Sequence, residues 1–359
     1  MDASLLTSRE FWDDQAPAVA GEPALAGHVL FETSGSSGTP KQVALSKVAL
    51  LASAGAVNRH LNVSTASCWG LALPLHHVGG FGVAARAFEA GCRFERFGGR
   101  WNAKAFGEWL QSSAVTHTSL VPTQVHDLAK ANLRAPRSLA AIVVGGGHLD
   151  TATGQQARNL GWPVLASYGM TEAGSQIATQ SLEELGFPYQ SSPIPLLPIW
   201  DAKTSADGLL SISGPALFSG YVMGGRFLPR EAEWHMTSDR AALTNRMLVP
   251  LGRVDTLVKI LGELVDPEAI ERELVAISQG AIQPGTFAIM AVPDERAGHV
   301  LVPVFESSIN PQLIESTLSS YDNEGRGLLR LRSPVVVDVL PRNELGKIQR
   351  SLLVAVIRN

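Results

Sequence analysis

The sequence contains few cysteines, no long apolar run and no long basic run, and each of these absences excludes a class of protein. Cys68 and Cys92 are too few for a disulfide framework or a cysteine-based metal site. No uninterrupted apolar segment approaches the roughly 20 residues that a membrane helix needs. The formal net charge of −4, without a basic run, argues against nucleic acid or an anionic membrane as the main partner. Residues 1–15 are acidic and lack a long apolar core, so we expect no signal peptide and a cytoplasmic location.

What the sequence does contain fits a globular protein of about two domains. The chain has 359 residues, of which 45% are hydrophobic and 17% are charged, a composition that supports sizeable cores. It has no internal repeat and no low-complexity tract. Local motifs therefore carry the information about function.

A loop rich in glycine and hydroxyl residues spans residues 33–41. It follows an apolar run, 28–31, that predicts a strand, and it precedes 46–61, where helical spacing and Ser46 as N-cap predict a helix. Backbone N–H groups, hydroxyls and the lysine can surround a phosphate, although an ordinary surface loop has the same composition. It is not a Walker A loop, because two residues separate its second glycine from the lysine. The candidate phosphate-binding residues are Thr33, Ser34, Gly35, Ser36, Ser37, Gly38, Thr39 and Lys41.

Two histidines and a lone arginine follow in an apolar context. An apolar strand candidate, 69–74, leads into His76 and His77, and two glycines come directly after Val78. This pattern at a strand end indicates a site, with simple packing as the alternative. The next predicted helix, 81–90, holds Arg86 among apolar residues, where a guanidinium must reach solvent or meet an anion. An ion pair with Glu89 is the ordinary alternative.

Further motifs occur along the rest of the chain. A buried strand candidate, 141–144, ends in Gly145-Gly146-Gly147, and residues 164–172 end in Tyr-Gly-Met-Thr-Glu. Residues 180–207 predict a loop with short strands, and 208–221 predict two strands joined by a turn. Proline-started helices are predicted after Asp266 and Asn310. Strand candidates lie at 286–292, 300–305 and 333–340.

Taken together and in this order, the motifs resemble those of the adenylate-forming superfamily of acyl- and aryl-CoA ligases, luciferases and peptide-synthetase adenylation domains. The resemblance extends from Phe31 to Arg350. Within it, residues 116–124 (Thr-His-Thr-Ser-Leu-Val-Pro-Thr-Gln) look like a segment of the o-succinylbenzoate–CoA ligase branch. That branch also has an arginine nine residues after its motif histidine, as Arg86 stands nine after His77.

The resemblance implies an α/β architecture with two domains. A large N-terminal α/β domain, 1–254, would bind ATP and the acid, and a small α+β C-terminal lid, 255–359, would move about a hinge at Asp255. About thirty residues precede the phosphate loop, so we expect a shortened N-terminal subdomain. Three positions depart from the family pattern: His76 stands in the usual place of a phenylalanine, Ser238 replaces a glycine, and Thr256 replaces an aspartate.

The same resemblance implies a role for each motif residue. Tyr168 would stack on adenine, Thr171 would contact the α-phosphate, and Glu172 would bind Mg²⁺, a hard cation that suits a carboxylate. Asp239 and Arg253 would bind the ribose, and Lys347 would serve adenylate formation. The other expected ATP-binding residues are Gly145, Gly146, Gly147, Ser167, Gly169 and Met170. The expected acid-binding residues are His77, which is also a catalytic candidate, Arg86, Ser119, Thr123 and Gly146.

The implied activity is ATP-dependent ligation of o-succinylbenzoate, an aromatic acid, to coenzyme A, as in menaquinone biosynthesis. ATP, Mg²⁺ and coenzyme A would be required. Another acyl- or aryl-CoA ligase would differ at Arg86 and 119–124, and a carrier-protein acylating enzyme is a further alternative. A non-catalytic nucleotide-binding module would be expected to lack Lys347 or Glu172, and both are present. The sequence leaves open whether the chain forms a homodimer.

Overall fold

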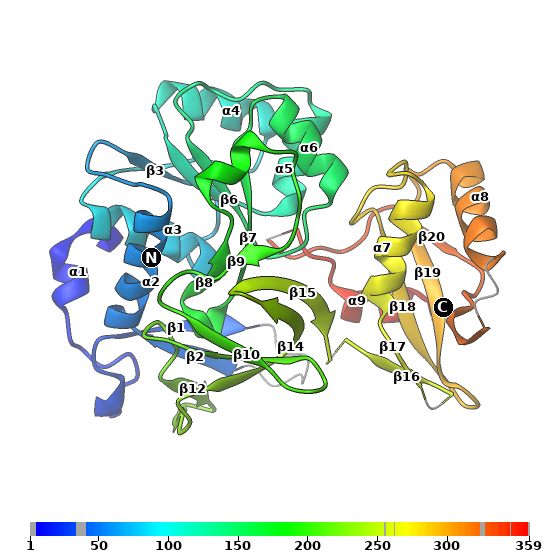
Figure 1. Cartoon of the computed structure of the whole chain (residues 1–359). Coiled ribbons are helices and arrows are strands. Elements are labelled where there is room, and N and C mark those ends of the chain that lie inside the picture. Colours follow the sequence, from blue (N-terminus) through cyan, green and yellow to red (C-terminus); the bar gives the residue numbers. More distant parts are fainter. Residues whose placement is uncertain are drawn as a thin grey trace. The chain divides into compact units, whose positions relative to one another are not determined.

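The computed structural model describes residues 5–33, 41–254, 256–261, 263–323, 327–344 and 346–357. The predicted phosphate-loop residues Ser34 to Thr39 and the predicted hinge residue Asp255 lie outside this set. The chain divides into two compact units (Figure 1). The first consists of Met1–Thr237 and Ala241–Pro250, and the second of Ser238–Arg240 and Leu251–Asn359. The predicted boundary between residues 254 and 255 stays a prediction.

The first unit is built around a mostly parallel sheet with strand order β4-β3-β5-β6-β7-β8, in which only the pairing of β7 with β8 is antiparallel among the pairings described. Strands β3, β5 and β6 are buried along their whole length, which explains their short apolar sequences. The strands are β3 (Cys68–Leu71), β4 (Arg93–Arg96), β5 (His117–Leu120), β6 (Ala141–Val144), β7 (Val164–Met170) and β8 (Ser175–Thr179).

Helices cover both faces of this sheet (Figure 1). The chain passes from β3 to β4 in one direction along the sheet, and then from β4 to β5, β6 and β7 in the other. Because such crossovers are right-handed, the connecting helices of the two directions lie on opposite faces. Two helices lie on one face, α2 (Lys47–His60) and α3 (Val78–Ala90); three lie on the other, α4 (Ala103–Ser112), α5 (Pro122–Lys130) and α6 (Thr151–Asn159).

Several local predictions are confirmed, and others were missed. The Ser46 hydroxyl accepts a hydrogen bond from the Ala49 N–H at 3.1 Å and caps α2 as predicted. The sequence did not predict β2 (Lys41–Ser46), which forms an antiparallel pair with β1 (His28–Thr33). It also did not predict β4, β5, α4 or α6. These elements are short, and pairing or packing with distant parts of the chain stabilises them more than their own residue preferences do.

Two antiparallel sheets complete this region. One has the order β1-β2-β12-β13, and the other β10-β11-β14-β15-β9. The predicted pair of strands in 208–221 is confirmed, but the two strands belong to different sheets. The remaining strands are β9 (Ile194–Pro195), β10 (Asp201–Thr204), β11 (Leu209–Ser213), β12 (Gly220–Met223), β13 (Arg226–Pro229), β14 (His235–Thr244) and β15 (Met247–Arg253). A short helix, α1 (Arg9–Asp13), precedes β1.

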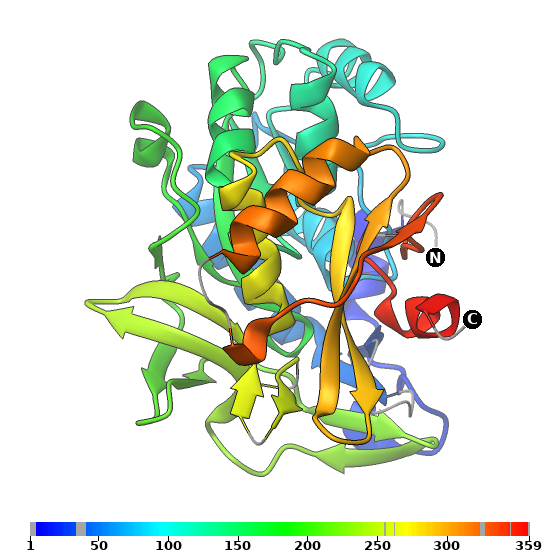
Figure 2. The ribbon, with the colours of Figure 1, turned by 90° about the vertical axis from the view of Figure 1, so that its right-hand side faces the viewer.

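The second unit is a small α+β structure, as the sequence predicts. Its sheet has the order β18-β19-β20, and alternate residues of β18 point to opposite faces: Phe287 and Ile289 pack with α7 and α8, and Ala288 and Met290 pack with α9. Helices α7 and α8 lie side by side (Figure 2). The elements are α7 (Pro267–Ile277), α8 (Pro311–Asp322), α9 (Arg350–Ile357), β16 (Val258–Ile260), β17 (Glu263–Val265), β18 (Phe287–Asp294), β19 (Gly298–Glu306) and β20 (Val335–Val337).

The predicted caps of both proline-started helices are present. Asp266 accepts from the Glu268 N–H at 3.0 Å, and Asn310 accepts from the Gln312 N–H at 2.9 Å. Within the residues that the structure describes, no helix is both long enough and apolar enough to cross a membrane.

Candidate active site

Four of the predicted motifs of the first unit follow the carboxyl ends of strands in its parallel sheet. Strands β3, β5, β6 and β7 are adjacent, and their carboxyl ends lead into the histidine pair, the Pro122-Thr123 turn, the glycine turn and Thr171-Glu172. A Cβ at Gly147 would lie 3.5 Å from Cγ of Pro122, which places the turns after β5 and β6 against each other. The connections that leave the neighbouring strands β3 and β5 run in opposite directions along the sheet, and such switch points are common ligand sites in α/β sheets.

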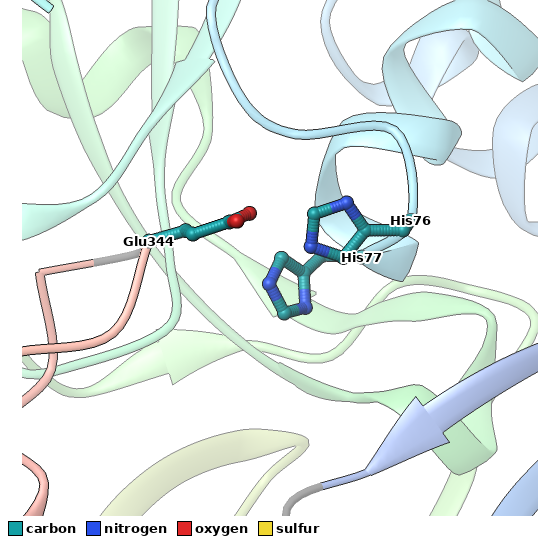
Figure 3. Close-up of side chains that lie close together, drawn as sticks. All are labelled: His76, His77 and Glu344. Atoms are coloured by element: carbon teal, nitrogen blue, oxygen red, sulfur yellow. The ribbon is translucent and has the colours of Figure 1, made fainter. Parts of the chain in front are cut away.

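The histidine pair stands directly before α3. The centroids of the His76 and His77 rings are 4.3 Å apart (Figure 3). The His77 carbonyl accepts hydrogen bonds from the N–H groups of Gly80 and Phe81, so His77 begins the helix. A Cβ at Gly80 would lie 2.2 Å from the Pro74 carbonyl oxygen, and only glycine fits there. Glu344, drawn in the same view, belongs to the second unit.

Arg86 is buried inside α3, with only 2% of its surface exposed. Its Nη1 donates to the Ser119 hydroxyl at 3.0 Å, and its Nη2 donates to the Ser175 hydroxyl at 3.4 Å. The guanidinium carbon lies 5.1 Å from the centroid of the Trp69 ring, a cation–π geometry. Burial lowers the pKa of Arg86 to about 9, so the side chain still carries its charge at neutral pH.

The ordinary explanation for Arg86, an ion pair with Glu89, does not hold. Glu89 instead accepts a hydrogen bond from the Asn58 amide at 2.7 Å. Among the described residues, no carboxylate pairs with Arg86; its side-chain partners there are two hydroxyls and an indole ring. A buried cation held only by neutral groups is suited to receive an anion from outside the protein.

Ser175 is a contact of Arg86 that the sequence did not predict. Its φ is 116°, a backbone conformation that residues other than glycine rarely adopt. Such strained positions cluster at functional sites. No local pattern marks this serine, because 89 residues separate it from Arg86. Thr123, which the resemblance also assigns to the acid, lies in the first turn of α5, and it is not among the described contacts of Arg86.

The Tyr-Gly-Met-Thr-Glu motif spans the end of β7 and a short 3-10 turn, Thr171–Ala173. The motif requires glycine at position 169, because a Cβ there would lie 1.6 Å from the Ser175 carbonyl oxygen on the paired strand β8. The pairing of the two strands also shifts register between Tyr168 and Gly169. Tyr168 is half-buried, so part of its surface remains accessible.

Glu172 lies next to Tyr221, the last residue of the predicted 208–221 segment, to which the sequence assigned no role. The Tyr221 hydroxyl donates to Oε1 of Glu172 at 3.1 Å, and Nζ of Lys41 lies 4.4 Å from the centroid of the Tyr221 ring. The Glu172 carboxylate is half-buried and hydrogen-bonded, and its oxygens are the hard ligands that Mg²⁺ prefers. The residues present therefore fit the expected cation.

The second unit brings its own predicted residues together. Oδ1 of Asp239 and Nη1 of Arg253 form an ion pair at 3.1 Å, and the Val254 N–H donates to the Ser238 carbonyl at 2.8 Å. Lys347 stands on a tight turn in which Asn343 exchanges hydrogen bonds with its backbone N–H and C=O. Desolvation and the charge of Arg253 lower the pKa of the Lys347 amine, and the side chain keeps contact with solvent.

Ion pairs that the sequence did not predict hold both ends of the Lys347 turn. Arg342 binds Oε1 of Glu306 on β19 at 3.0 Å, and Arg350, the first residue of α9, binds Glu271 on α7 at 2.9 Å. The partners are 36 and 79 residues apart in the chain. The roles of the site residues stay predictions, but the structure brings them together in two sets, one in each unit.

Comparison with known proteins supports the same family. A family model described as AMP-binding enzyme matches residues 9–222. The 2-succinylbenzoate–CoA ligase of Escherichia coli K12 is 30% identical over 283 residues, which are 76% of this chain and 57% of that protein. The chain thus spans little more than half of the length of this curated relative.

Solved structures of o-succinylbenzoate CoA synthetase from Bacillus subtilis have the same fold. The complex with its acyl-adenylate intermediate has a TM-score of 0.73 and 26% identity, covering 90% of this chain and 68% of that one. The complex with ATP and a magnesium ion has a TM-score of 0.73 and 25% identity, covering 90% and 69%. The predicted α/β fold of the adenylate-forming type is confirmed.

Proposed function

Because the chain belongs to the family of AMP-binding enzymes, we propose that it activates o-succinylbenzoate with ATP and transfers the acyl group to coenzyme A. It would be an acid–thiol ligase that forms AMP, with ATP and coenzyme A as co-substrates. The names of its relatives and of the similar solved structures support this assignment. A cytoplasmic location and a homodimer, both raised by the sequence, stay predictions, and light scattering after size-exclusion chromatography measures the second.

The observation that carries the choice of acid is the buried Arg86. An aromatic dicarboxylic acid has one carboxylate to activate and a second that must be held. A second carboxylate buried without a partner would be very costly, so a fixed cation is expected to receive it. Arg86 has this character because its neighbours Ser119, Ser175 and Trp69 orient it without neutralising it.

The first half-reaction would join the acid to the nucleotide. A carboxylate oxygen of the acid attacks the α-phosphorus of ATP, and pyrophosphate leaves. Negative charge grows on the phosphate oxygens, and the hydroxyl of Thr171 and the amines of Lys41 and Lys347 are the groups assigned to stabilise it. Tyr168 would stack on the adenine, and Asp239 and Arg253 would hold the ribose.

The second half-reaction would release AMP. The thiolate of coenzyme A attacks the acyl carbon of the adenylate, a thioester forms, and AMP leaves with the bonding electron pair. Neither half-reaction requires a protein nucleophile.

Glu172 would hold Mg²⁺, which supplies positive charge to the triphosphate when bound.

A panel of carboxylic acids tests the proposal. Pyrophosphate release and thioester formation are measured for o-succinylbenzoate and for matched aromatic acids that lack the second carboxylate. We expect o-succinylbenzoate to give the highest kcat/KM, and we expect chelation of Mg²⁺ to stop pyrophosphate release. If a monocarboxylic acid is preferred, the assignment to o-succinylbenzoate is wrong, whereas assignment as a ligase survives.

A further inference from the structure

Tyr221 lies between two groups that the resemblance assigns to the phosphates and the metal. It is on β12, which pairs with β2 so that Tyr221 stands opposite Val43. Lys41 is two residues from Val43 on β2, so its side chain is on the same face of the sheet as Val43. Such diagonal neighbours are within reach of an aromatic ring and a long side chain. The register of this strand pair therefore places the lysine ammonium 4.4 Å from the ring centroid.

The hydroxyl of the same tyrosine reaches a different element. It donates to Oε1 of Glu172 at 3.1 Å, and the main chain supports this contact because the Phe218 N–H donates to the Glu172 carbonyl at 2.8 Å. In this contact the phenol supplies the proton, because an ionised carboxylate can only accept a hydrogen bond. One side chain thus contacts a carboxylate with its hydroxyl and an ammonium with its ring.

We propose that Tyr221 is a positioning residue that couples the metal ligand Glu172 to the phosphate-binding Lys41, an inference that rests on the proposed function. Its hydroxyl restricts the carboxylate to one orientation. Its ring restricts the long, flexible lysine side chain, whose ordering would otherwise cost entropy on each binding of the nucleotide. The tyrosine acts through these two groups and does not need to touch the nucleotide itself.

Two substitutions separate the two contacts. Tyr221→Phe removes the hydroxyl and keeps the ring, whereas Tyr221→Leu removes both. Tyr189→Phe is the control, because Tyr189 is a buried tyrosine of the first unit whose hydroxyl has no hydrogen-bond partner among the described residues. Binding of ATP to each full-length protein is measured by titration calorimetry, once with Mg²⁺ and once with EDTA. Thermal melting checks that each variant is folded.

The expected results differ for the two variants. Tyr221→Phe should weaken ATP binding about ten-fold or more in Mg²⁺, as for loss of a hydrogen bond to a charged group, and less than two-fold in EDTA. Tyr221→Leu should also weaken binding in EDTA, by roughly 3- to 30-fold, because it removes the cation–π contact. Tyr189→Phe should match the wild type in both buffers. A merely structural role of Tyr221 would change binding equally with and without the metal.

Two outcomes would overturn the inference. One is a Tyr221→Phe protein that binds ATP like the Tyr189→Phe control in both buffers. The other is a Tyr221→Phe protein whose affinity for ATP falls equally in Mg²⁺ and in EDTA. Because these titrations contain neither acid nor coenzyme A, they decide the role of Tyr221 even if the acid panel shows that o-succinylbenzoate is not the substrate. Conversely, a failed Tyr221 test leaves the result of the acid panel intact.

Discussion

At the scale of single residues, the protein has a buried charge and a strained backbone position at the place where we propose that the acid binds. Arg86 is buried with neutral partners, and Ser175 beside it has a positive φ. Both features cost stability in the free protein. We expect that a bound anionic substrate offsets the cost at Arg86.

Replacing Arg86 should therefore separate stability from activity. Arg86→Ala should raise KM for o-succinylbenzoate by a factor equivalent to about 2–5 kcal/mol, as for a broken buried charge pair, with KM for ATP nearly unchanged. Arg86→Lys should restore little, because an ammonium lacks the two parallel donors of a guanidinium. Steady-state kinetics with each substrate varied in turn measure both effects. An unchanged KM for the acid in Arg86→Ala would remove Arg86 from the acid site.

The stability of a ligand-free variant gives an independent check on Arg86. Arg86→Met fills a similar volume without a buried charge, so it should raise the free energy of unfolding by about 1–4 kcal/mol. Urea denaturation without ligands measures this change. A large loss of stability would show that Arg86 is mainly a structural residue.

Lys347 allows the two half-reactions to be tested separately. The resemblance assigns its charge to adenylate formation, so Lys347→Ala should slow pyrophosphate release by about 10² or more. Thioester formation from preformed acyl-adenylate should be largely preserved. Single-turnover assays of each step measure the two rates. Equal losses in both steps, or no loss in either, would contradict the assigned role.

At the scale of elements, the pairing of β7 with β8 determines where the site residues lie. It sets Gly169 against the backbone of Ser175, and it fixes the two segments that lead to Glu172 and to the Ser175 contact with Arg86. A change at one glycine should therefore disturb both ends of the site.

Gly169→Ala tests this dependence. The added Cβ meets a backbone oxygen that cannot rotate away, so the variant should lose about 3 kcal/mol or more of unfolding free energy. Gly107→Ala is the matched control: Gly107 lies within α4 with no atom near its missing Cβ, and the change should add up to about 1 kcal/mol. Urea denaturation compares the two. Changes in unfolding free energy that are small and similar in both variants would show that β7 and β8 move apart easily enough to accept the added Cβ.

At the scale of the whole molecule, the chain consists of two compact units with separate cores, and each carries part of the predicted site. The two half-reactions require different groups near the phosphate. A change in the placement of the second unit between the steps is therefore a reasonable expectation, with Asp255 as the predicted hinge.

Substitution at the predicted hinge tests this expectation. Asp255→Pro should restrict φ to near −65° and so hinder rotation about this residue. Thioester formation should then fall more than adenylate formation, which the two single-turnover assays measure. Asp255→Ala, which leaves φ unrestricted, is the control and should retain both steps. Full activity of the proline variant in both steps would exclude Asp255 as the hinge.

The sequence by itself determined the features that depend on near neighbours in the chain. The caps at Ser46, Asp266 and Asn310 were predictable because each capping side chain accepts a hydrogen bond from an N–H only two or three residues further along the chain. The family was recognisable because its motifs are contiguous, from the glycine-rich loop to the turn that carries Lys347.

Only the tertiary structure decided which distant side chains meet. Ser175 contacts Arg86 across 89 residues, and Tyr221 contacts Glu172 across 49. Strand β2 was missed for the same reason, because its partners β1 and β12 define it. Such contacts depend on strand register and on which helix packs against which face of a sheet. Composition and spacing do not encode these relations locally, since they arise only when the whole chain has buried its cores.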